Sequence, residues 1–165
     1  MKAIVAVDKN WGIGKNNDLL FSIPEDMKFF RSTTLNKVVV MGGNTLRSFP
    51  NGNPLKNRIN VVLSTRINRE DCIIARSYSE LFEIIKRYES DEVFVIGGAS
   101  VYREMLPFID EILVTKVEAD GKADVFFENL DKLDNFKVIF EGEEQINNGY
   151  KFRFTTYKNT AVKSF

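Results

Sequence analysis

Glu92-Val-Phe-Val-Ile-Gly-Gly-Ala-Ser-Val-Tyr102 joins a continuous apolar run to two glycines and to the start of a helical pattern. An apolar run of this length predicts a strand that is buried on both faces, and Pro107 ends the short helix that follows. The same order of strand, glycine pair and short helix occurs earlier, from Lys37 to Phe49. Two such units predict a mostly parallel sheet covered by helices.

Both glycine pairs could bind an anion, because a strand that turns through glycines into a helix presents free backbone N–H groups. Neither pair has the three glycines at fixed spacing that mark a dinucleotide-binding turn of the Rossmann type. A single glycine pair is a weak signal for phosphate binding. Two pairs, each after a buried strand, favour phosphate binding more strongly.

The remaining apolar runs complete the sheet. Further strands are expected at residues 3–7, 58–63, 72–75, 111–117, 136–140 and 150–157. The last two alternate apolar with polar residues, and Asn147-Asn-Gly149 predicts a hairpin turn between them. The sequence therefore predicts a three-layer α/β fold in one domain over residues 1–165, with a mostly parallel central sheet flanked by helices and an antiparallel C-terminal hairpin. The tail after Tyr157 is expected to be loose.

Composition excludes several classes of protein. The 23 basic and 23 acidic side chains give zero net charge, which argues against binding nucleic acid or an anionic membrane through bulk charge. No apolar run approaches membrane-spanning length, and the N-terminus is typical of a strand rather than a signal peptide. The lone Cys72 allows no internal disulfide, fits a reducing cytoplasm and is expected to pack rather than react. Without histidine, Ser–His or Cys–His catalysis is excluded and no metal is expected.

One carboxylate lies on an apolar helical face. Ser22-Ile-Pro-Glu-Asp-Met-Lys-Phe-Phe-Arg31 begins a helix, with a capping box predicted between Ser22 and Glu25. Asp26 shares its face with Phe30, four residues on. A carboxylate on an apolar face is costly unless it has a partner. Asp26 is therefore either a charge that caps the helix or a site residue that awaits a ligand.

Local sequence patterns also predict the structure of two other segments. Residues 8–21 predict a long loop, because glycine, asparagine and aspartate are dense there. Its length and its several large apolar side chains favour a lid over a plain surface connection. A second capping box, Ser77 with Glu80, predicts a helix that ends near Tyr88.

Together these motifs resemble the dihydrofolate reductase family over nearly the whole chain. The matching pieces, in the family's order, are Ile4-Val-Ala-Val7, Gly12-Ile-Gly-Lys-Asn-Asn-Asp-Leu19, Pro24-Glu-Asp26 with Phe30, Val40-Met-Gly42 with Thr45 and Ser48, Leu63-Ser-Thr-Arg66, Val95-Ile-Gly-Gly-Ala-Ser-Val-Tyr102, Val114-Thr115 and Asp124-Val-Phe-Phe127. Each piece alone is a weak signal, but the ordered set is specific. The resemblance favours a site role for Asp26.

The resemblance implies NADPH-dependent reduction of 7,8-dihydrofolate to 5,6,7,8-tetrahydrofolate, which supports one-carbon metabolism. Hydride passes to pterin C6 and a proton is added at N5. A pterin presents a ring N–H beside an exocyclic amine, which Asp26 can accept as paired, charge-assisted hydrogen bonds. By resemblance, Thr115 bonds the same carboxylate and amine, while Leu19 and Phe21 belong to the lid at the reacting end. We expect Asp26 to orient the ring and favour protonation while water supplies the proton, and its apolar surroundings to raise its pKa.

The resemblance also assigns the substrate pocket. Ile4 and Ile96 offer backbone carbonyls near the pterin amine, and Arg58 clamps the α-carboxylate of the folate glutamate. The pocket walls are Val5, Ala6, Met27, Phe30, Phe49 and Leu55, and Tyr102 lies close to both ligands. Without the resemblance, most of these residues would be interpreted as ordinary core, and Arg58 as a solvated charge at the start of a strand.

The cofactor implied by the resemblance is NADPH. Its pyrophosphate is expected at Gly43-Asn44-Thr45 and Gly97-Gly98-Ala99-Ser100-Val101, with a cis bond between Gly97 and Gly98. Ser64, Thr65, Arg66 and Arg76 supply hydroxyls and cations for a 2′-phosphate, which favours NADPH over NADH. Further contacts are expected from Ala6, Ile13, Gly14, Leu63, Ile96 and Tyr102. The lid, residues 8–23, would close over the nicotinamide and be steadied by Asp124.

Three positions depart from the family pattern. Leu19-Leu-Phe21 replaces Leu-Pro-Trp, which loosens the lid and removes an indole N–H near the pterin. Gly43 stands where some members have a phosphate-binding arginine, so cofactor affinity is expected to depend more on Arg66 and Arg76. Val125 replaces a threonine, and Glu128 a proline, in the segment that supports the lid.

The sequence leaves two other functions open. One is a reductase of the same fold that acts on a pyrimidine of the riboflavin pathway, against which Asp26 with Phe30 and Arg58 argues. The other is a protein that binds NADPH or folate without catalysis, against which the Asp26–Thr115 pair argues. The expected form is a cytoplasmic monomer whose partner is a small molecule, not nucleic acid or a membrane.

Overall fold

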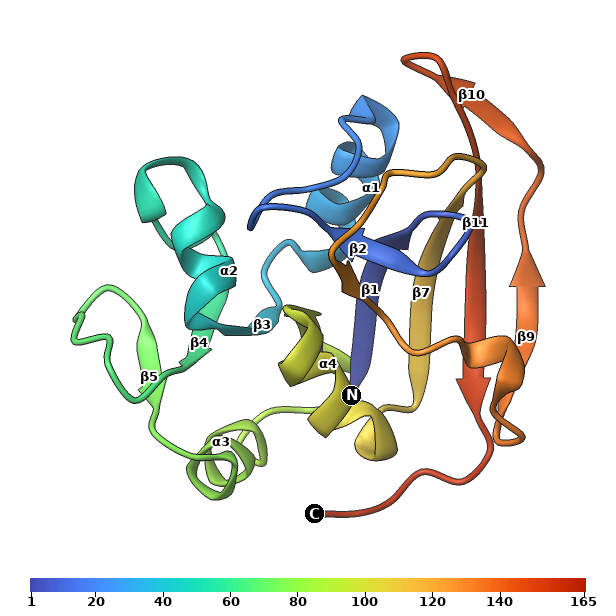
Figure 1. Ribbon diagram of the computed structural model, residues 1–165. Coiled ribbons are helices and arrows are strands. Elements are labelled where there is room, and N and C mark those ends of the chain that lie inside the picture. Colours follow the sequence, from blue (N-terminus) through green and yellow to red (C-terminus); the bar gives the residue numbers. More distant parts are fainter.

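A nine-stranded sheet lies at the centre of the computed structural model, which describes residues 1–165 (Figure 1). Its strands are β1 (Lys2–Val7), β3 (Val38–Gly42), β4 (Ile59–Leu63), β5 (Ile73–Ala75), β6 (Val93–Gly97), β7 (Glu111–Val117), β9 (Phe136–Glu141), β10 (Gln145–Asn147) and β11 (Tyr150–Asn159). Their order is β10-β11-β7-β1-β6-β3-β4-β5, and β9 also pairs with β11. Every pair from β7 to β5 is parallel, whereas β11 runs antiparallel to β7, β9 and β10. The predicted mostly parallel sheet with an antiparallel C-terminal hairpin is confirmed.

A second, two-stranded sheet is formed by β2 (Gly12–Gly14) and β8 (Val125–Phe126). β2 lies inside residues 8–21, which the sequence predicted to be loop throughout. That prediction was wrong at the centre of the segment. The partner of β2 lies more than a hundred residues further along the chain, so the local composition could not indicate the pairing.

Four α-helices and four 3₁₀ helices surround the sheet. The α-helices are α1 (Pro24–Thr34), α2 (Gly43–Ser48), α3 (Tyr78–Ile85) and α4 (Ala99–Met105). The 3₁₀ helices are η1 (Pro50–Gly52), η2 (Ser90–Glu92), η3 (Leu106–Phe108) and η4 (Leu130–Lys132). The longest α-helix, α1, has 11 residues, and no helix has the length and apolar character needed to cross a membrane.

The helices cover both faces of the sheet. Val38 and Val40 of β3 belong to the main core, together with buried residues of α3 and α4 such as Leu81. Met41, the next residue of β3, packs instead with Leu46 of α2. Successive strand residues point to opposite sides of a sheet, so α2 lies on the face opposite α3 and α4. The uninterrupted apolar composition of β3 follows from burial on both faces.

The N-terminus of α1 is capped from a distant part of the chain. The predicted capping box between Ser22 and Glu25 is wrong, because the N-cap residue is Ile23, whose side chain cannot accept a hydrogen bond. The Glu25 N–H donates to Oδ1 of Asn147, 3.2 Å away, where β10 enters its hairpin turn. Asn148 adds a second link by donating from Nδ2 to the Ser22 carbonyl over 2.6 Å. The hairpin therefore supplies the acceptor that the local sequence was expected to supply.

α3 begins as the sequence predicted. Oγ of Ser77 accepts a hydrogen bond from the Glu80 N–H over 3.1 Å, so the second capping motif is confirmed on its Ser77 side. The helix ends at Ile85 rather than near Tyr88. The next residues continue as hydrogen-bonded turns, with Arg87 and Tyr88 donating to carbonyls of the last helical turn.

The C-terminal tail is not loose, contrary to expectation. β11 continues to Asn159, two residues beyond the predicted strand end at Tyr157. The ring of Phe165 stacks on Phe82 with centroids 4.8 Å apart and meets Phe108 edge-on at 5.7 Å. Aromatic contacts of this kind, which depend on tertiary packing, attach the tail to α3 and η3.

We predict that Asn147→Ala lowers the free energy of unfolding by about 1 kcal/mol, because an N–H of the first turn of α1 loses its acceptor. Asn147→Asp keeps an acceptor and adds a charge that suits a helix N-terminus, so it is expected to retain the stability. Urea unfolding measures both changes.

Ser22→Ala is the matched control, since the Ser22 side chain caps nothing while its carbonyl is unchanged by the substitution. Its effect is expected to stay within about 0.5 kcal/mol. A larger loss for Ser22→Ala than for Asn147→Ala would contradict capping by Asn147.

Candidate active site

Asp26 lies on α1 and contacts Thr115 of β7. Oγ1 of Thr115, a buried residue, donates a hydrogen bond to Oδ1 of Asp26 over 2.6 Å. Phe29 holds α1 against the sheet, with its ring centroid 4.5 Å from that of Phe154 on the neighbouring strand β11. The carboxylate is thus bonded to the sheet rather than to the N-terminus of its own helix, which excludes the capping role.

Burial controls the charge of Asp26. Loss of contact with water raises the pKa of this carboxyl above its ordinary value of 3.8, and the hydrogen bond from Thr115 partly opposes that rise. No salt bridge of the protein involves Asp26, and its second oxygen, Oδ2, has no protein partner. A desolvated carboxylate with a free oxygen is the arrangement expected of a group that binds a ligand.

Tyr102 links α4 to the first strand. Its hydroxyl donates to the Ile4 carbonyl over 2.7 Å, and both residues are buried. Burial raises the pKa of Tyr102 well above its ordinary value, so the hydroxyl keeps its proton and remains a donor. A carbonyl oxygen has two lone pairs, so Ile4 retains one for a ligand amine.

The other predicted wall residues differ in exposure. Phe49, Leu55 and Ile96 pack against one small buried cluster that includes Val39 and Met41. Val5 is buried in the main core, whereas Leu19 on the lid is 69% exposed and Met27 on α1 is 46% exposed. Phe30 is half-buried. Met27 directly follows Asp26 on α1, so exposed apolar surface lies next to the carboxylate residue and suits an apolar ligand.

Arg58 is positioned by three oxygen atoms. Its Nη1 donates to the Lys56 carbonyl at 2.6 Å, its Nη2 to the Arg31 carbonyl at 2.9 Å, and its Nε to Oγ1 of Thr34 at 3.2 Å. Partial burial and the charge of Arg31 lower the pKa of Arg58, but a guanidinium remains protonated in proteins. Of its five N–H donors, two remain for an anionic ligand.

Asn60 was not predicted, although it fixes the loop that carries Leu55 and Arg58. Its buried amide accepts from the Leu55 N–H at 3.0 Å and donates to the carbonyls of Leu55 at 2.9 Å and Arg58 at 3.2 Å. A buried amide must satisfy its donors and acceptors, and here the loop backbone does so. A polar residue within an apolar predicted strand was the signal that could have identified Asn60.

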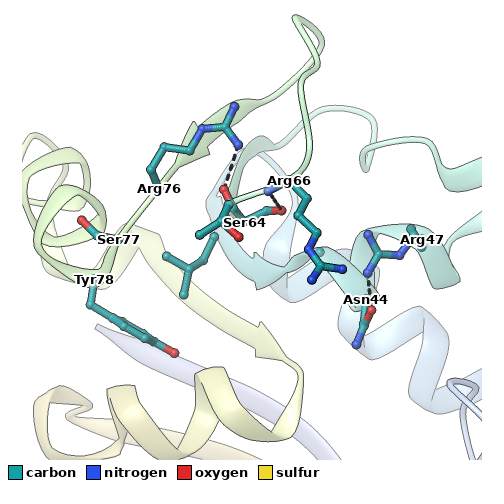
Figure 2. A pocket seen from close by; sticks show the side chains of 10 residues that line it. Asn44, Arg47, Ser64, Arg66, Arg76, Ser77 and Tyr78 are labelled. Atoms are coloured by element: carbon teal, nitrogen blue, oxygen red, sulfur yellow. Dashed lines mark hydrogen bonds between the residues drawn. The ribbon is translucent and has the colours of Figure 1, made fainter.

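A cleft of about 390 Å³ opens beside α2 (Figure 2). Its lining consists of Gly43, Asn44, Arg47, Leu63, Ser64, Thr65, Arg66, Arg76, Ser77 and Tyr78. These residues lie at or directly after the carboxyl ends of β3, β4 and β5, which is where α/β sheets bind ligands. The cleft brings the predicted residues after β4 together with Gly43, Asn44 and Arg76. Arg47, Ser77 and Tyr78 were not predicted.

The two glycine turns lie next to each other, because β3 and β6 are neighbours in the sheet. Oγ1 of Thr45 in the first turn lies 3.3 Å from the position that a Cβ on Gly97 would occupy. The peptide bond between Gly97 and Gly98 is cis, as the resemblance implied. Ala99, Ser100 and Val101 begin α4 directly after this turn.

The remaining predicted cofactor residues, Ala6, Ile13 and Gly14, lie in β1 and β2 rather than in the cleft. Both glycine turns follow the carboxyl ends of neighbouring strands, so their backbones lie at the same end of the sheet. β2, in contrast, belongs to the lid.

Asp8 fastens the base of the lid and was not predicted. Its buried carboxylate accepts from the N–H groups of Asn10 and Gly12 through Oδ1, at 2.8 and 2.7 Å. Its Oδ2 accepts from the Gly121 N–H at 3.0 Å. One side chain therefore joins the lid to the segment before β8. An acidic residue directly after a buried strand was the only local signal for this role.

Two further contacts hold the lid. Asp124 accepts from the Asn16 N–H through Oδ2 at 3.1 Å, which confirms the predicted contact between Asp124 and the lid. At the other end of the lid, the ring of Phe21 lies 4.9 Å from that of Tyr150 on β11. Phe21 is thus packed against the C-terminal hairpin.

Cys72 and the acidic residues form no reactive or metal-binding group. Burial and the nearby Asp71 raise the pKa of the Cys72 thiol, and Cys72 packs against the buried cluster that includes Val39 and Met41, as expected of a packing cysteine. Nowhere are three or more histidine, cysteine, aspartate or glutamate side chains arranged to hold a metal ion.

Comparison with known proteins covers the same residues that build this site. A family model described as dihydrofolate reductase matches residues 1–159. The dihydrofolate reductase of Bacillus subtilis (strain 168) is 33% identical over 159 residues, covering 94% of this chain and 92% of its own. That of Rattus norvegicus is 35% identical over 181 residues, covering 96% of each chain. The viral dihydrofolate reductase of Saimiriine herpesvirus 2 (strain 488) is 34% identical over 180 residues, covering 96% of this chain and 84% of its own.

We predict that Asp26→Asn stabilises the protein at neutral pH and reduces the pH dependence of its stability. The raised pKa means that the folded chain binds this proton more tightly than the unfolded chain does. The resulting stabilisation is complete below the ordinary carboxyl pKa of 3.8 and is lost as the pH rises through the folded-state value. Urea unfolding at a series of pH values from roughly 4 to 8 measures the effect.

Glu25→Gln serves as the control, because Glu25 is an exposed carboxylate one position away on the same helix. It is expected to keep the pH dependence of the parent. The drop in unfolding free energy from acidic to neutral pH is the quantity to compare. If it is equal in the parent and in Asp26→Asn, burial of the Asp26 charge costs nothing and the prediction is wrong.

Proposed function

Because the chain belongs to the dihydrofolate reductase family, we propose that it reduces 7,8-dihydrofolate to 5,6,7,8-tetrahydrofolate with NADPH as its cofactor. Family membership confirms the resemblance inferred from the ordered motifs and makes the chain an oxidoreductase. The observation that carries the proposed site is the Asp26–Thr115 pair, a desolvated carboxylate with one oxygen bonded and one free.

Asp26 and Thr115 act on the pterin ring in this proposal. The carboxylate accepts the ring N–H and the exocyclic amine as paired, charge-assisted hydrogen bonds. Thr115 fixes the rotation of the carboxylate through the bond to Oδ1, so that Oδ2 remains directed to the ligand. The negative charge favours protonation of the ring at N5, while water supplies that proton.

The cleft and the glycine turns fit a phosphorylated dinucleotide. Arginine and hydroxyl side chains line the cleft, and no carboxylate does. This donor set suits a phosphomonoester, which is the group that distinguishes NADPH from NADH. When bound, NADPH supplies the hydride that is transferred to C6 of the pterin. The residues of the chain bind the phosphates, and the lid excludes water.

Arg58 is proposed to bind the α-carboxylate of the folate glutamate. Its three hydrogen bonds to Arg31, Thr34 and Lys56 hold the guanidinium in one orientation, so little conformational entropy remains to be lost on binding. Asn60 fixes the backbone on which Arg58 lies. The guanidinium then offers its two remaining N–H donors, one on each Nη, to a carboxylate.

We also propose that the chain acts as a cytoplasmic, single-domain monomer. One continuous sheet carries Asp26's partner, the glycine turns and the basic cleft, so a second copy is not needed to complete the site. The lone, packed Cys72 suits a reducing compartment.

The decisive test follows NADPH oxidation at 340 nm with 7,8-dihydrofolate. We predict turnover by the parent and a loss of roughly 10²–10³-fold in Asp26→Asn near neutral pH, because the paired charged hydrogen bonds and the electrostatic effect on the ring are both removed. The control is Asp131→Asn, at an exposed aspartate bonded to Tyr157, which is expected to keep nearly full activity.

Turnover that survives in Asp26→Asn would refute the role of Asp26 while leaving the reaction intact. A folded parent that binds NADPH without turnover would refute the reaction and favour a protein that only binds.

A separate prediction concerns Arg58. Arg58→Gln is expected to raise the KM for dihydrofolate about 10- to 100-fold with little change in kcat, because the lost charged pair is distant from the reacting atoms. A dihydropterin that lacks the glutamate is the control substrate, and the substitution is expected to leave its kcat/KM unchanged. An equal loss with both substrates would show that Arg58 supports the loop rather than the carboxylate.

A further inference from the structure

Arg47, in the last turn of α2, lines the basic cleft and has no role so far. The cleft contains three arginines, Arg47, Arg66 and Arg76, and no acidic residue. None of the three takes part in a salt bridge, whereas the arginine Arg69 outside the cleft pairs with Asp71. Three unpaired cations around one cleft repel one another, so the arrangement favours an anionic ligand.

The hydrogen bonds of the arginines separate their roles. Arg76 is bound on two sides, donating from Nη1 to the Ser64 carbonyl at 2.9 Å and from Nη2 to Oδ1 of Asn68 at 2.5 Å. Arg47 has one partner, Oδ1 of Asn44, to which its Nη2 donates (Figure 2). That partner is neutral, so it orients the guanidinium without neutralising it. Most N–H donors of Arg47 remain available to a ligand.

Gly43 lies beside the Arg47 guanidinium. A Cβ at position 43 would lie 3.4 Å from Nη1 of Arg47, 3.0 Å from Cδ1 of Ile67 and 3.5 Å from Oγ of Ser64. The Arg47 guanidinium and the Ser64 hydroxyl therefore approach the same point from opposite elements. A Cβ at position 43 would be in ordinary contact with both of them and would press only on Ile67. The Arg47 guanidinium therefore lies on the same side of the cleft as Ser64.

We propose that Arg47 is a further phosphate-binding residue, which contacts the 2′-phosphate of the cofactor and contributes to discrimination between NADPH and NADH. The inference rests on the proposed function, since it takes NADPH to be the ligand of this cleft. A phosphomonoester carries nearly two negative charges and three acceptor oxygens, enough for more than one guanidinium. Arg47 supplies a planar pair of donors, which matches phosphate geometry.

The test measures the affinity of the whole protein for NADPH and for NADH by isothermal titration calorimetry. Arg47→Gln is expected to weaken NADPH binding about tenfold and to change NADH binding less than about twofold, since only NADPH carries the 2′-phosphate. Arg47→Lys keeps the charge without the fork and is expected to recover part of the loss.

Arg87→Gln is the matched control, because Arg87 is an exposed arginine outside the cleft. It is expected to leave both affinities unchanged. If Arg87→Gln weakens NADPH binding as much as Arg47→Gln does, the effect is one of net charge and the proposal is overturned. NADPH bound equally well by Arg47→Gln and the parent would overturn it while the parent's turnover upheld the proposed function. Equal weakening of NADPH and NADH would overturn the contact with the 2′-phosphate.

A pH series adds an independent readout. The second ionisation of a phosphomonoester has a pKa near 6, so the ligand loses charge below that pH. The affinity difference between the parent and Arg47→Gln is therefore expected to shrink at pH values near 5. A difference that stays constant from pH 5 to 8, roughly, would contradict a contact with the 2′-phosphate.

Discussion

A single desolvated carboxylate constrains the site. Asp26 lies where burial raises its pKa, so keeping it there carries an electrostatic cost that other contacts must offset. Thr115 holds the carboxylate from β7, and Asn147 caps the helix that carries it. Because β7 pairs with β11, both supports belong to the same antiparallel part of the sheet. The C-terminal hairpin therefore maintains the position of Asp26 as well as closing the edge of the sheet.

The parallel part of the sheet has a different task. The carboxyl ends of β3, β4, β5 and β6 open into glycine turns and a basic cleft, where backbone N–H groups and arginines suit an anion. β1 lies between the two parts, and Tyr102, which follows β6, donates to the Ile4 carbonyl within it. One buried hydrogen bond thus couples the side that suits phosphate to the side that suits a pterin. The two ligands of the proposed reaction would meet at this junction.

Elements with strong local patterns could be predicted, and contacts between distant segments could not. β1, β4 and β7 lie within a residue of their expected bounds, because runs of apolar residues are a strong local signal for strands. The cap of α1 was assigned to Ser22, since a box motif is local, whereas the real acceptor lies 122 residues away from its donor. Asn60 and Asp8 were missed for the same reason. Each is a polar side chain that forms hydrogen bonds with backbone groups, and only folding brings those groups close to it.

The lid shows how a departure from the family pattern is accommodated by packing. Leu20 and Phe21 replace a proline and a tryptophan, and loss of the proline removes a restriction on the backbone. Here the side chains restrict it instead. Leu20 fills the space above Gly121, where a Cβ would come within 2.8 Å of Cδ1 of Leu20, and Phe21 packs on Tyr150. Gly121 also donates to Asp8, so the same glycine anchors both ends of the lid. The lid is also held before these residues, by the pairing of β2 with β8 and by the bond from Asn16 to Asp124. Leu19, directly before Leu20, nevertheless stays exposed, so the held lid keeps one large apolar side chain open to a ligand.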